Sequence, residues 1–249
     1  MTPYQKNSTF SMPKKEAIRD MFDSIAPSYD RLNHLMSLNV DKWWRRHALR
    51  EIVDGTPQQV LDVACGTGDS TVSVARAAAP GSHVTGVDIS EGMMTLVTEK
   101  AIRAGVQDRL SLQVADGEAL PFPEASFDRV TCAFGIRNFE HKEKGLQEFC
   151  RVLRPGGKAV ILELSVPRSR LLRWGYDLYF MHLLPWIGGK LSGNAQAYRY
   201  LPASVHAFFT ATSAVRRRNS SAQPEQQQTS FTEKEPPAVL RSFPARLRR

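Results

Sequence analysis

Apolar positions along the first two thirds of the chain follow two different periods. Short apolar runs typical of buried strands alternate with longer stretches whose apolar residues recur at a helical spacing. The runs predict five strands, at 60–63, 83–87, 110–115, 128–134 and 158–164. The clearest helical patterns cover 91–104 and 142–153. This alternation predicts an α/β fold with a doubly wound, mainly parallel sheet of Rossmann-like type.

The two ends of the chain differ from this central part. Residues 1–50 predict an N-terminal helical cap, in which Pro27 is expected to separate two helices. Residues 51–208 form the main domain, and 168–205 within it is a mixture of aromatic, leucine and arginine residues with amphipathic character. Residues 209–249 are rich in Ser, Gln, Pro and Arg without a period, which predicts a disordered basic tail with no strand.

A glycine loop follows the first predicted strand, in the sequence LDVACGTGD that ends at Asp69. Asp62, Gly66 and Gly68 give the spacing Asp-x-x-x-Gly-x-Gly. Thr71 stands where a dinucleotide fingerprint has its third glycine, and Asp69, expected to cap the next helix, places negative charge where a pyrophosphate would bind. A cationic cofactor without phosphates therefore fits better, and the spacing resembles the S-adenosylmethionine loop of seven-strand methyltransferases.

Two further acidic residues follow the next two predicted strands. Asp88 stands at the end of the second strand, where a carboxylate suits hydrogen bonding to a ribose diol. Asp116 follows the third strand, where a carboxylate can reach an adenine amino group. Because ligands of open α/β sheets bind outside the carboxyl ends of the strands, both aspartates are candidates for cofactor binding.

Composition excludes several other classes of protein. The net charge is +8, but the last forty residues carry eight Lys or Arg and three Glu, which leaves only +3 for the rest and argues against nucleic-acid binding. The three cysteines, at 65, 132 and 150, are too few and too widely spaced for a disulfide framework or a metal site. No apolar run is long enough to span a membrane and no targeting signal is evident, so we expect a cytoplasmic protein.

Five separated stretches resemble one family, the ubiquinone/menaquinone-biosynthesis C-methyltransferases. They are FDSIAPSYDRLNHLMSLNVDKWWRR, LDVACGTGD, ADGEALPFPEASFD, FGIRNFEHKEKGLQEFCRVLRPGG and YRYLPASV. His34, where other members have Asp, is closer to the menaquinone branch. Family members often have Ser at the position of Ala133. The family sequence normally continues after YRYLPxSV with a helix and a strand hairpin, but this chain departs after Phe208, so the sheet is expected to lack its last two strands.

The resemblance implies methyl transfer from S-adenosylmethionine to a ring carbon of a prenylated quinol, with cofactor contacts at Thr67, Asp88, Asp116 and Gly117. Demethylmenaquinol is the favoured acceptor. A methoxy-polyprenyl-benzoquinol of ubiquinone biosynthesis, another lipid-like acceptor and an inactive cofactor-binding relative remain alternatives. The insoluble tail of such a substrate predicts peripheral membrane contact through residues 168–186, and the oligomeric state stays open, a homodimer included.

The acceptor chemistry indicates three candidate catalytic residues. A quinol carbon attacks a methyl group well only when the neighbouring hydroxyl loses its proton. Arg137 stays protonated, so we assign it to stabilising the developing phenolate rather than to taking the proton. Asn138 and Tyr29 are expected to orient the quinol or a proton-carrying water, and His34 is a weaker candidate for the same task.

Overall fold

A computed structural model of the chain describes residues 14–37, 39–164 and 238–244, together with the single positions or short runs 169, 171, 174–175, 178–179, 200, 203–205 and 207–208. Its six strands form one sheet. They are β1 (Gln59–Val63), β2 (His83–Asp88), β3 (Leu110–Val114), β4 (Phe127–Ala133), β5 (Leu153–Leu164) and β6 (Ala238–Pro244). The order in the sheet is β3-β2-β1-β4-β5-β6. The first five strands run parallel, which confirms the predicted doubly wound α/β fold.

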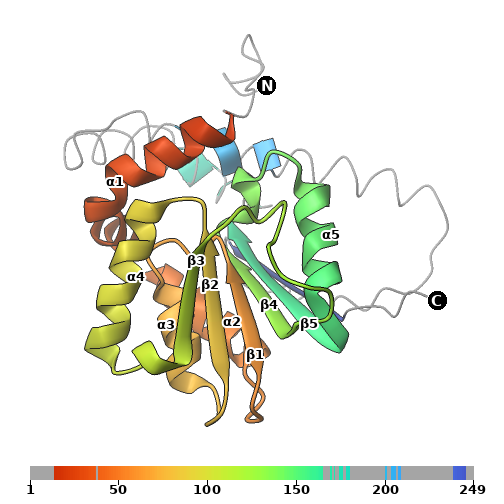
Figure 1. The fold of residues 1–249 in the computed structure, drawn as a ribbon. Coiled ribbons are helices and arrows are strands. Elements are labelled where there is room, and N and C mark those ends of the chain that lie inside the picture. Colours follow the sequence, from red (N-terminus) through yellow and green to blue (C-terminus); the bar gives the residue numbers. More distant parts are fainter. Residues whose placement is uncertain are drawn as a thin grey trace, which may run out of the picture.

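The helices lie on both faces of the sheet and across one of its ends (Figure 1). They are α1 (Lys15–Met36), α2 (Val40–Ile52), α3 (Asp69–Ala77), α4 (Glu91–Ala104) and α5 (Lys142–Val152), with the short 3-10 turns η2 (Gln107–Arg109) and η3 (Ile136–Asn138). Helices α2, α3 and α4 cover one face, and α5 covers the other (Figure 1). The strand order reverses between β1 and β4, and ligands of such sheets bind at that crevice.

Two apolar cores explain this layering, because successive side chains of a strand point to opposite faces. Val60 belongs to the core under α2 and α3, whereas its neighbour Leu61 belongs to the core under α5. Val160 and Ile161 of β5 divide in the same way. The nearly continuous apolar runs of the sequence are therefore what a parallel sheet covered on both faces requires.

Pro27 does not break the N-terminal helix, contrary to the expectation of two helices. Helix α1 is continuous from Lys15 to Met36 with Pro27 inside it. Ile25 and Ala26, next to the proline, are buried and pack with Met93 of α4. A proline inside a helix removes a backbone hydrogen bond and costs about 3 kcal/mol. This tertiary packing offsets that cost.

The tail also differs from its prediction. No strand is expected after residue 208, yet β6 pairs antiparallel with the whole C-terminal half of β5, from Lys158 opposite Pro244 to Leu164 opposite Ala238. Without β6, the outer edge of β5 would present a row of unpaired backbone groups, and pairing with any extended segment satisfies them. The rest of the predicted disordered tail, at 209–237 and 245–249, lies outside the described residues.

Candidate active site

The glycine loop leaves β1 through a tight turn that begins α3. Ala64, Gly66 and Gly68 all have positive φ, at 54°, 56° and 83°. At Gly68 a Cβ atom would lie 2.5 Å from Cγ1 of Val97, so only glycine fits between this turn and α4. Gly68 is also the residue before the first turn of α3. The loop is thus held against α4 by close packing, as the predicted nucleoside-cofactor turn requires.

Asp69 does not cap α3, which corrects the expectation from its position in the sequence. It is the first helical residue, and no side chain caps the helix at Gly68. Its carboxylate instead pairs with Lys100 of α4, 2.5 Å away. Burial would raise the pKa of Asp69, but the charges of Arg45 and Lys100 hold it below its usual range. The loop therefore carries a negative charge that is already compensated.

Asp62 is buried at the end of β1 and lines the cavity. One carboxylate oxygen accepts a 2.6 Å hydrogen bond from the Thr71 hydroxyl. The other has no hydrogen-bond partner among the described residues. Burial raises the pKa of Asp62 to about 6, against the opposing effects of the Thr71 hydroxyl and the Arg45 charge. A buried carboxylate oxygen without a donor is an available partner for a cationic ligand.

Asp88 is the last residue of β2 and Asp116 follows the end of β3, close to the predicted positions. The two Asp88 oxygens accept hydrogen bonds from the backbone N–H groups of Gly66 (2.8 Å) and Ser90 (2.9 Å), so this carboxylate organises the glycine loop. Burial raises the pKa of Asp88 in spite of these donors. Asp116 pairs with Lys15 of α1 and accepts from the Glu118 N–H at 2.9 Å.

Helix α1 lies over the carboxyl ends of the strands (Figure 1). Polar contacts at three points along its length hold it there. Lys15 reaches Asp116. Asp23 accepts hydrogen bonds from the Ser90 hydroxyl at 2.5 Å and the Gly92 N–H at 3.0 Å. Asp30 accepts from the Thr67 hydroxyl of the glycine loop at 2.5 Å and pairs with Lys100 at 2.5 Å. The helix thereby forms the roof of the cavity.

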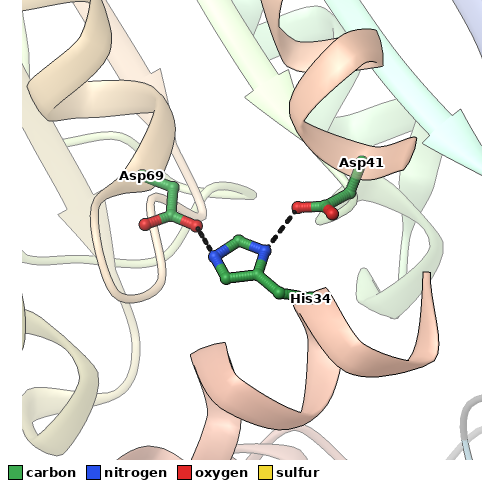
Figure 2. A group of neighbouring side chains, drawn as sticks. All are labelled: His34, Asp41 and Asp69. Carbon is green, nitrogen blue, oxygen red and sulfur yellow. Dashed lines mark hydrogen bonds and ion pairs between the residues drawn. The ribbon is translucent and has the colours of Figure 1, made fainter. Parts of the chain in front are cut away.

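His34 bridges two carboxylates beside this roof (Figure 2). Its Nδ1 lies 2.9 Å from Asp41 of α2, and its Nε2 lies 3.4 Å from Asp69 of α3. The two ring nitrogens face away from each other, so the imidazole links the carboxylates rather than sharing one ion with them (Figure 2). His34 lies in the last turn of α1 and is not among the residues that line the cavity.

The candidate catalytic residues form a second group of side chains at the cavity. Tyr29 and Asn138 line it, whereas Arg137 lies behind them with 4% of its surface exposed. The Arg137 guanidinium donates to Glu163 at 2.6 Å and also to the Phe134 carbonyl oxygen. Burial raises the pKa of Tyr29, and the Arg137 charge opposes that rise.

Tyr200, from the YRYLPASV stretch, contacts this group of residues. Its hydroxyl donates a 3.1 Å hydrogen bond to Oδ1 of Asn138 and leaves the Asn138 amide N–H groups to other partners. Burial raises the pKa of Tyr200 to about 12.

One cavity therefore collects most of the residues predicted from the sequence. They are Tyr29, Asp62, Gly66, Thr67, Asp88, Asp116, Gly117 and Asn138. Gly68 and Arg137 lie behind its wall rather than in it. The backbone of Gly117 lies directly against the Phe139 ring, and a Cβ atom there would come 2.5 Å from Cζ of Phe139.

Four functional contacts escape the reasoning from sequence: Lys15, Lys100, Glu163 and Tyr200. Glu163 had a usable signal, because a charged residue interrupts the apolar run AVILEL of a buried strand. Tyr200 lies in a stretch that resembles the family, but nothing local indicates its contact with Asn138. The two lysines lie on amphipathic helices among many other surface charges, and nothing distinguishes them.

A doubly wound sheet with a non-dinucleotide glycine loop and acidic residues at or near the carboxyl ends of β1, β2 and β3 is the architecture of an S-adenosylmethionine-dependent methyltransferase. The family model described as the ubiE/COQ5 methyltransferase family matches residues 11–215, and the chain belongs to that family. Its family membership rests on this match and on close relatives.

Two such relatives come from bacteria. The "Ubiquinone/menaquinone biosynthesis C-methyltransferase UbiE" of Geobacter sulfurreducens is 50% identical over 195 residues, which cover 78% of this chain and 76% of that protein. The "Demethylmenaquinone methyltransferase" of Deinococcus radiodurans is 49% identical over 197 residues, covering 78% and 80%. Among solved structures, the cyclase SpnF superposes with a TM-score of 0.56 at 21% identity, covering 65% of this chain and 64% of that one. That last likeness concerns the fold alone.

Proposed function

We propose that this protein transfers the methyl group of S-adenosylmethionine to a ring carbon of a prenylated quinol, with demethylmenaquinol as the acceptor. The observation that carries the proposal is that one cavity brings together two unlike groups of residues: buried carboxylates around the glycine loop, called the cofactor side, and Tyr29 and Asn138 with Arg137 behind them, called the acceptor side. Relatives named for demethylmenaquinone methylation support the choice of acceptor.

The carboxylate side is assigned to the cofactor. Asp62 offers its unpartnered oxygen to the cationic amino-acid end, with Gly66 and Thr67 beside it. Asp88 is assigned to the ribose diol, and Asp116 with Gly117 to the adenine. Lys15 holds Asp116 in the described structure, so an adenine amino group would compete with this lysine for the carboxylate. Bound S-adenosylmethionine supplies an electrophilic methyl group on a sulfonium.

The other side is assigned to the acceptor. Methyl transfer to a ring carbon needs negative charge on the neighbouring oxygen, and the Arg137 guanidinium can stabilise that charge without leaving its protonated state. Tyr29 and Asn138 line the cavity, so they can hold the ring hydroxyl or a water that carries its proton away. In-line displacement depends strongly on geometry, so holding the ring in place is the main task of these residues.

A transfer assay with methyl-labelled cofactor tests the proposal. We expect methylation of demethylmenaquinol at a much higher kcat/KM than of a methoxy-polyprenyl-benzoquinol. The reverse preference would place the chain on the ubiquinone side of the family. Calorimetric binding of S-adenosylmethionine without transfer to either quinol, or to a sterol or other lipid-like acceptor, would instead identify a cofactor-binding relative without this activity.

A membrane surface is the proposed place where the quinol is taken up. Leu171, Trp174 and Leu178 are 77%, 68% and 51% exposed, and their spacing of three and four residues places them on one face of a helix. Arg168, Arg170 and Arg173 occur in the same stretch of sequence. Exposed aromatic and leucine side chains with nearby arginines are typical of segments that rest on a bilayer. No helix in the described part of the chain is long and apolar enough to cross one.

Vesicle sedimentation tests this contact. Replacing Leu171, Trp174 and Leu178 by Glu should abolish pelleting with vesicles that contain anionic lipid, while methylation of a short-chain, water-soluble quinol continues. Ile102→Glu is the control, because Ile102 is also an exposed apolar residue, at 60%, but belongs to a different element, α4. Equal pelleting of the triple variant and the unchanged protein would refute the contact. The oligomeric state, a homodimer included, stays a prediction.

A further inference from the structure

Glu163 is a buried carboxylate inside an otherwise apolar strand. It is 3% exposed and lies next to the last residue of β5, after Ile161 and Leu162, which are both buried apolar residues. Burying a carboxylate is costly unless donors surround it, and a well-packed apolar residue at such a place is often as stable or more stable. Stability alone therefore gives little reason for a carboxylate here.

The donors around Glu163 come mainly from a single residue. Arg137 donates twice: its Nη1 lies 2.6 Å from Oε1, and its backbone N–H lies 3.2 Å from Oε2. The Leu164 N–H also donates to Oε1 at 2.9 Å. The same carboxylate thus holds both the main chain and the guanidinium of Arg137 and fixes the orientation of one relative to the other.

The turn held in this way is part of the cavity wall. Arg137 is the middle residue of η3, and Asn138, the next residue, lines the cavity. The Asn138 N–H donates back to the Gly135 carbonyl at 2.9 Å, which closes the turn. A shift of the Arg137 backbone would therefore shift Asn138 as well.

Not every donor of the Arg137 guanidinium has a partner among the described residues. Its Nε is fully buried and has no hydrogen-bond partner among the described residues. A buried donor without an acceptor is unfavourable, so the orientation of the guanidinium is set by its other contacts and not by Nε. Nη1 is committed to Glu163 and to the Phe134 carbonyl, so the donors that remain on the guanidinium are those of Nε and Nη2.

We propose that Glu163 is a positioning residue, which holds the Arg137 guanidinium and the η3 turn so that the guanidinium charge and Asn138 face the acceptor oxygen. This inference rests on the proposed function for the identity of the acceptor. Glu163 takes no proton and touches no substrate. Its effect is to fix a donor before charge develops on the ring oxygen, which is where fixed electrostatic groups accelerate a reaction.

Glu163→Gln and Glu163→Asp test the proposal. Glutamine removes the charge, and aspartate keeps it but withdraws the carboxylate by one methylene group. We expect each variant to lose about 100-fold in kcat, as displacement of a catalytic group by about 1 Å can do. The Kd for S-adenosylmethionine should stay within about twofold, because the cofactor side has separate contacts. Should the glutamine variant fail to fold, the aspartate variant carries the test alone.

Glu148→Gln is the matched control. Glu148 also pairs with an arginine, Arg151, at 2.7 Å and also accepts from a backbone N–H, that of Leu120, but it lies on α5 away from the cavity. Its kcat should equal that of the unchanged protein. A double variant adds a second check: Arg137→Lys combined with Glu163→Gln should be no slower than Arg137→Lys alone, because Glu163 acts through Arg137. Additive losses would overturn the proposal.

A measurement independent of turnover separates this inference from the proposed function. In protein labelled with nitrogen-15 arginine, the buried Arg137 Nε–H should give a signal protected from solvent exchange, and Glu163→Gln should abolish that protection. If no quinol is methylated, the proposed function fails while the nuclear magnetic resonance result still decides the positioning role. An Arg137 signal equally protected in both proteins would overturn that role.

Discussion

The cofactor side of the cavity is built from neighbours in the chain, whereas the acceptor side is assembled from four distant segments. Gly66, Thr67 and Asp88 lie within about one strand–helix–strand unit, and Asp116 follows the next strand. Tyr29, Arg137, Glu163 and Tyr200 come from α1, η3, β5 and the stretch near 200. The cofactor side can therefore be recognised as a local sequence motif, whereas the residues of the acceptor side come together only when the sheet has formed.

The two sides also use charge differently. Around the glycine loop, carboxylates outnumber their partners, and burial raises the pKa of both Asp62 and Asp88. On the acceptor side, the guanidinium of Arg137 is paired with one carboxylate, Glu163, and interacts with the neutral phenols of Tyr29 and Tyr200. A surplus of negative charge suits a cationic cofactor, and a fixed positive group suits an oxygen that becomes anionic. Variants on the two sides should therefore fail in different ways.

The largest effect is expected at Arg137. Arg137→Ala should lower kcat about 100- to 1,000-fold, the usual loss when one donor to a developing oxyanion is removed. The Kd for S-adenosylmethionine should change by no more than about twofold, because the cofactor contacts are separate. Transfer assays quenched at fixed times measure kcat, and calorimetry measures the Kd for S-adenosylmethionine. Unchanged turnover would remove Arg137 from the mechanism.

Two further variants separate a loss of turnover in Arg137→Ala from a loss of folding. Arg137→Ala leaves Glu163 buried without its partner, which is strongly destabilising. Arg137→Lys keeps a positive charge opposite Glu163 but loses the planar fork, so it should stay folded and still lose turnover. Arg154→Ala removes an arginine paired with Asp128 at 2.9 Å, remote from the cavity, and should leave kcat unchanged.

The opposite pattern is expected at Asp88. Asp88→Ala removes an acceptor of charge-assisted hydrogen bonds and should weaken S-adenosylmethionine binding by about 2 kcal/mol, or about 30-fold in Kd. At saturating cofactor, kcat should remain close to that of the unchanged protein. Asp108→Ala, an exposed acid in η2, is the control and should alter neither quantity. A lower kcat with an unchanged Kd would contradict the division into two sides.

The fold and the cofactor side were largely predictable for a physical reason. Apolar periodicity located the five parallel strands, and parallel strands bring their carboxyl ends to one edge. Asp62, Asp88 and Asp116 each stand at or just after such an end, so their convergence follows from position in sequence. No knowledge of side-chain packing was needed for that step.

The acceptor side was not predictable in the same way. Glu163 meets Arg137 because β4 and β5 pair with Ala133 opposite Leu162. The sequence of neither strand alone predicts such a register. Pro27 inside α1 and the strand at 238–244 were missed for a related reason, since contacts with distant elements override the local signal. Asp69 was placed as a cap by a local rule, yet it pairs with Lys100 and His34.

A pH titration sharpens the account of the cofactor side. The folded-state pKa of Asp62 is raised to about 6, so the carboxylate that attracts a cation is lost as the pH falls through that value. At pH 5 only about one tenth of Asp62 is ionised, and affinity for S-adenosylmethionine should be about tenfold weaker than at pH 8. Asp62→Asn should bind weakly at both pH values.

The pH dependence that Asp62 gives to folding stability should be opposite in sign to the one it gives to cofactor affinity. A raised pKa means that the folded state favours the protonated carboxyl group, so this group contributes stability below its usual pKa and loses it as pH rises through about 6. Thermal melts of unchanged protein and Asp62→Asn should therefore diverge as pH increases, while their cofactor affinities converge as it decreases. Parallel trends in affinity and stability would rule out Asp62 as the source of the titration.

The smallest effect is expected where α1 meets the cofactor side, at Lys100. Its ammonium group, 20% exposed on its side chain, joins Asp30 of α1 to Asp69 of the glycine loop. Pairs of this kind contribute roughly 0.2–1 kcal/mol each. Lys100→Ala should therefore speed amide exchange in α1 and raise the KM for S-adenosylmethionine only about two- to threefold. The control is Arg103→Ala, which removes an exposed pair with Glu99 on the same helix.

This weak variant is informative because α1 also carries Tyr29 of the acceptor side. If Lys100 fastens the roof as a whole, its loss should raise the KM for quinol together with that for the cofactor, and salt should reduce the difference between variant and unchanged protein. A change confined to the cofactor would mean that the Asp30 contact is local to the glycine loop. In that case α1 would act as two separate contacts rather than as one roof joining the two sides of the cavity.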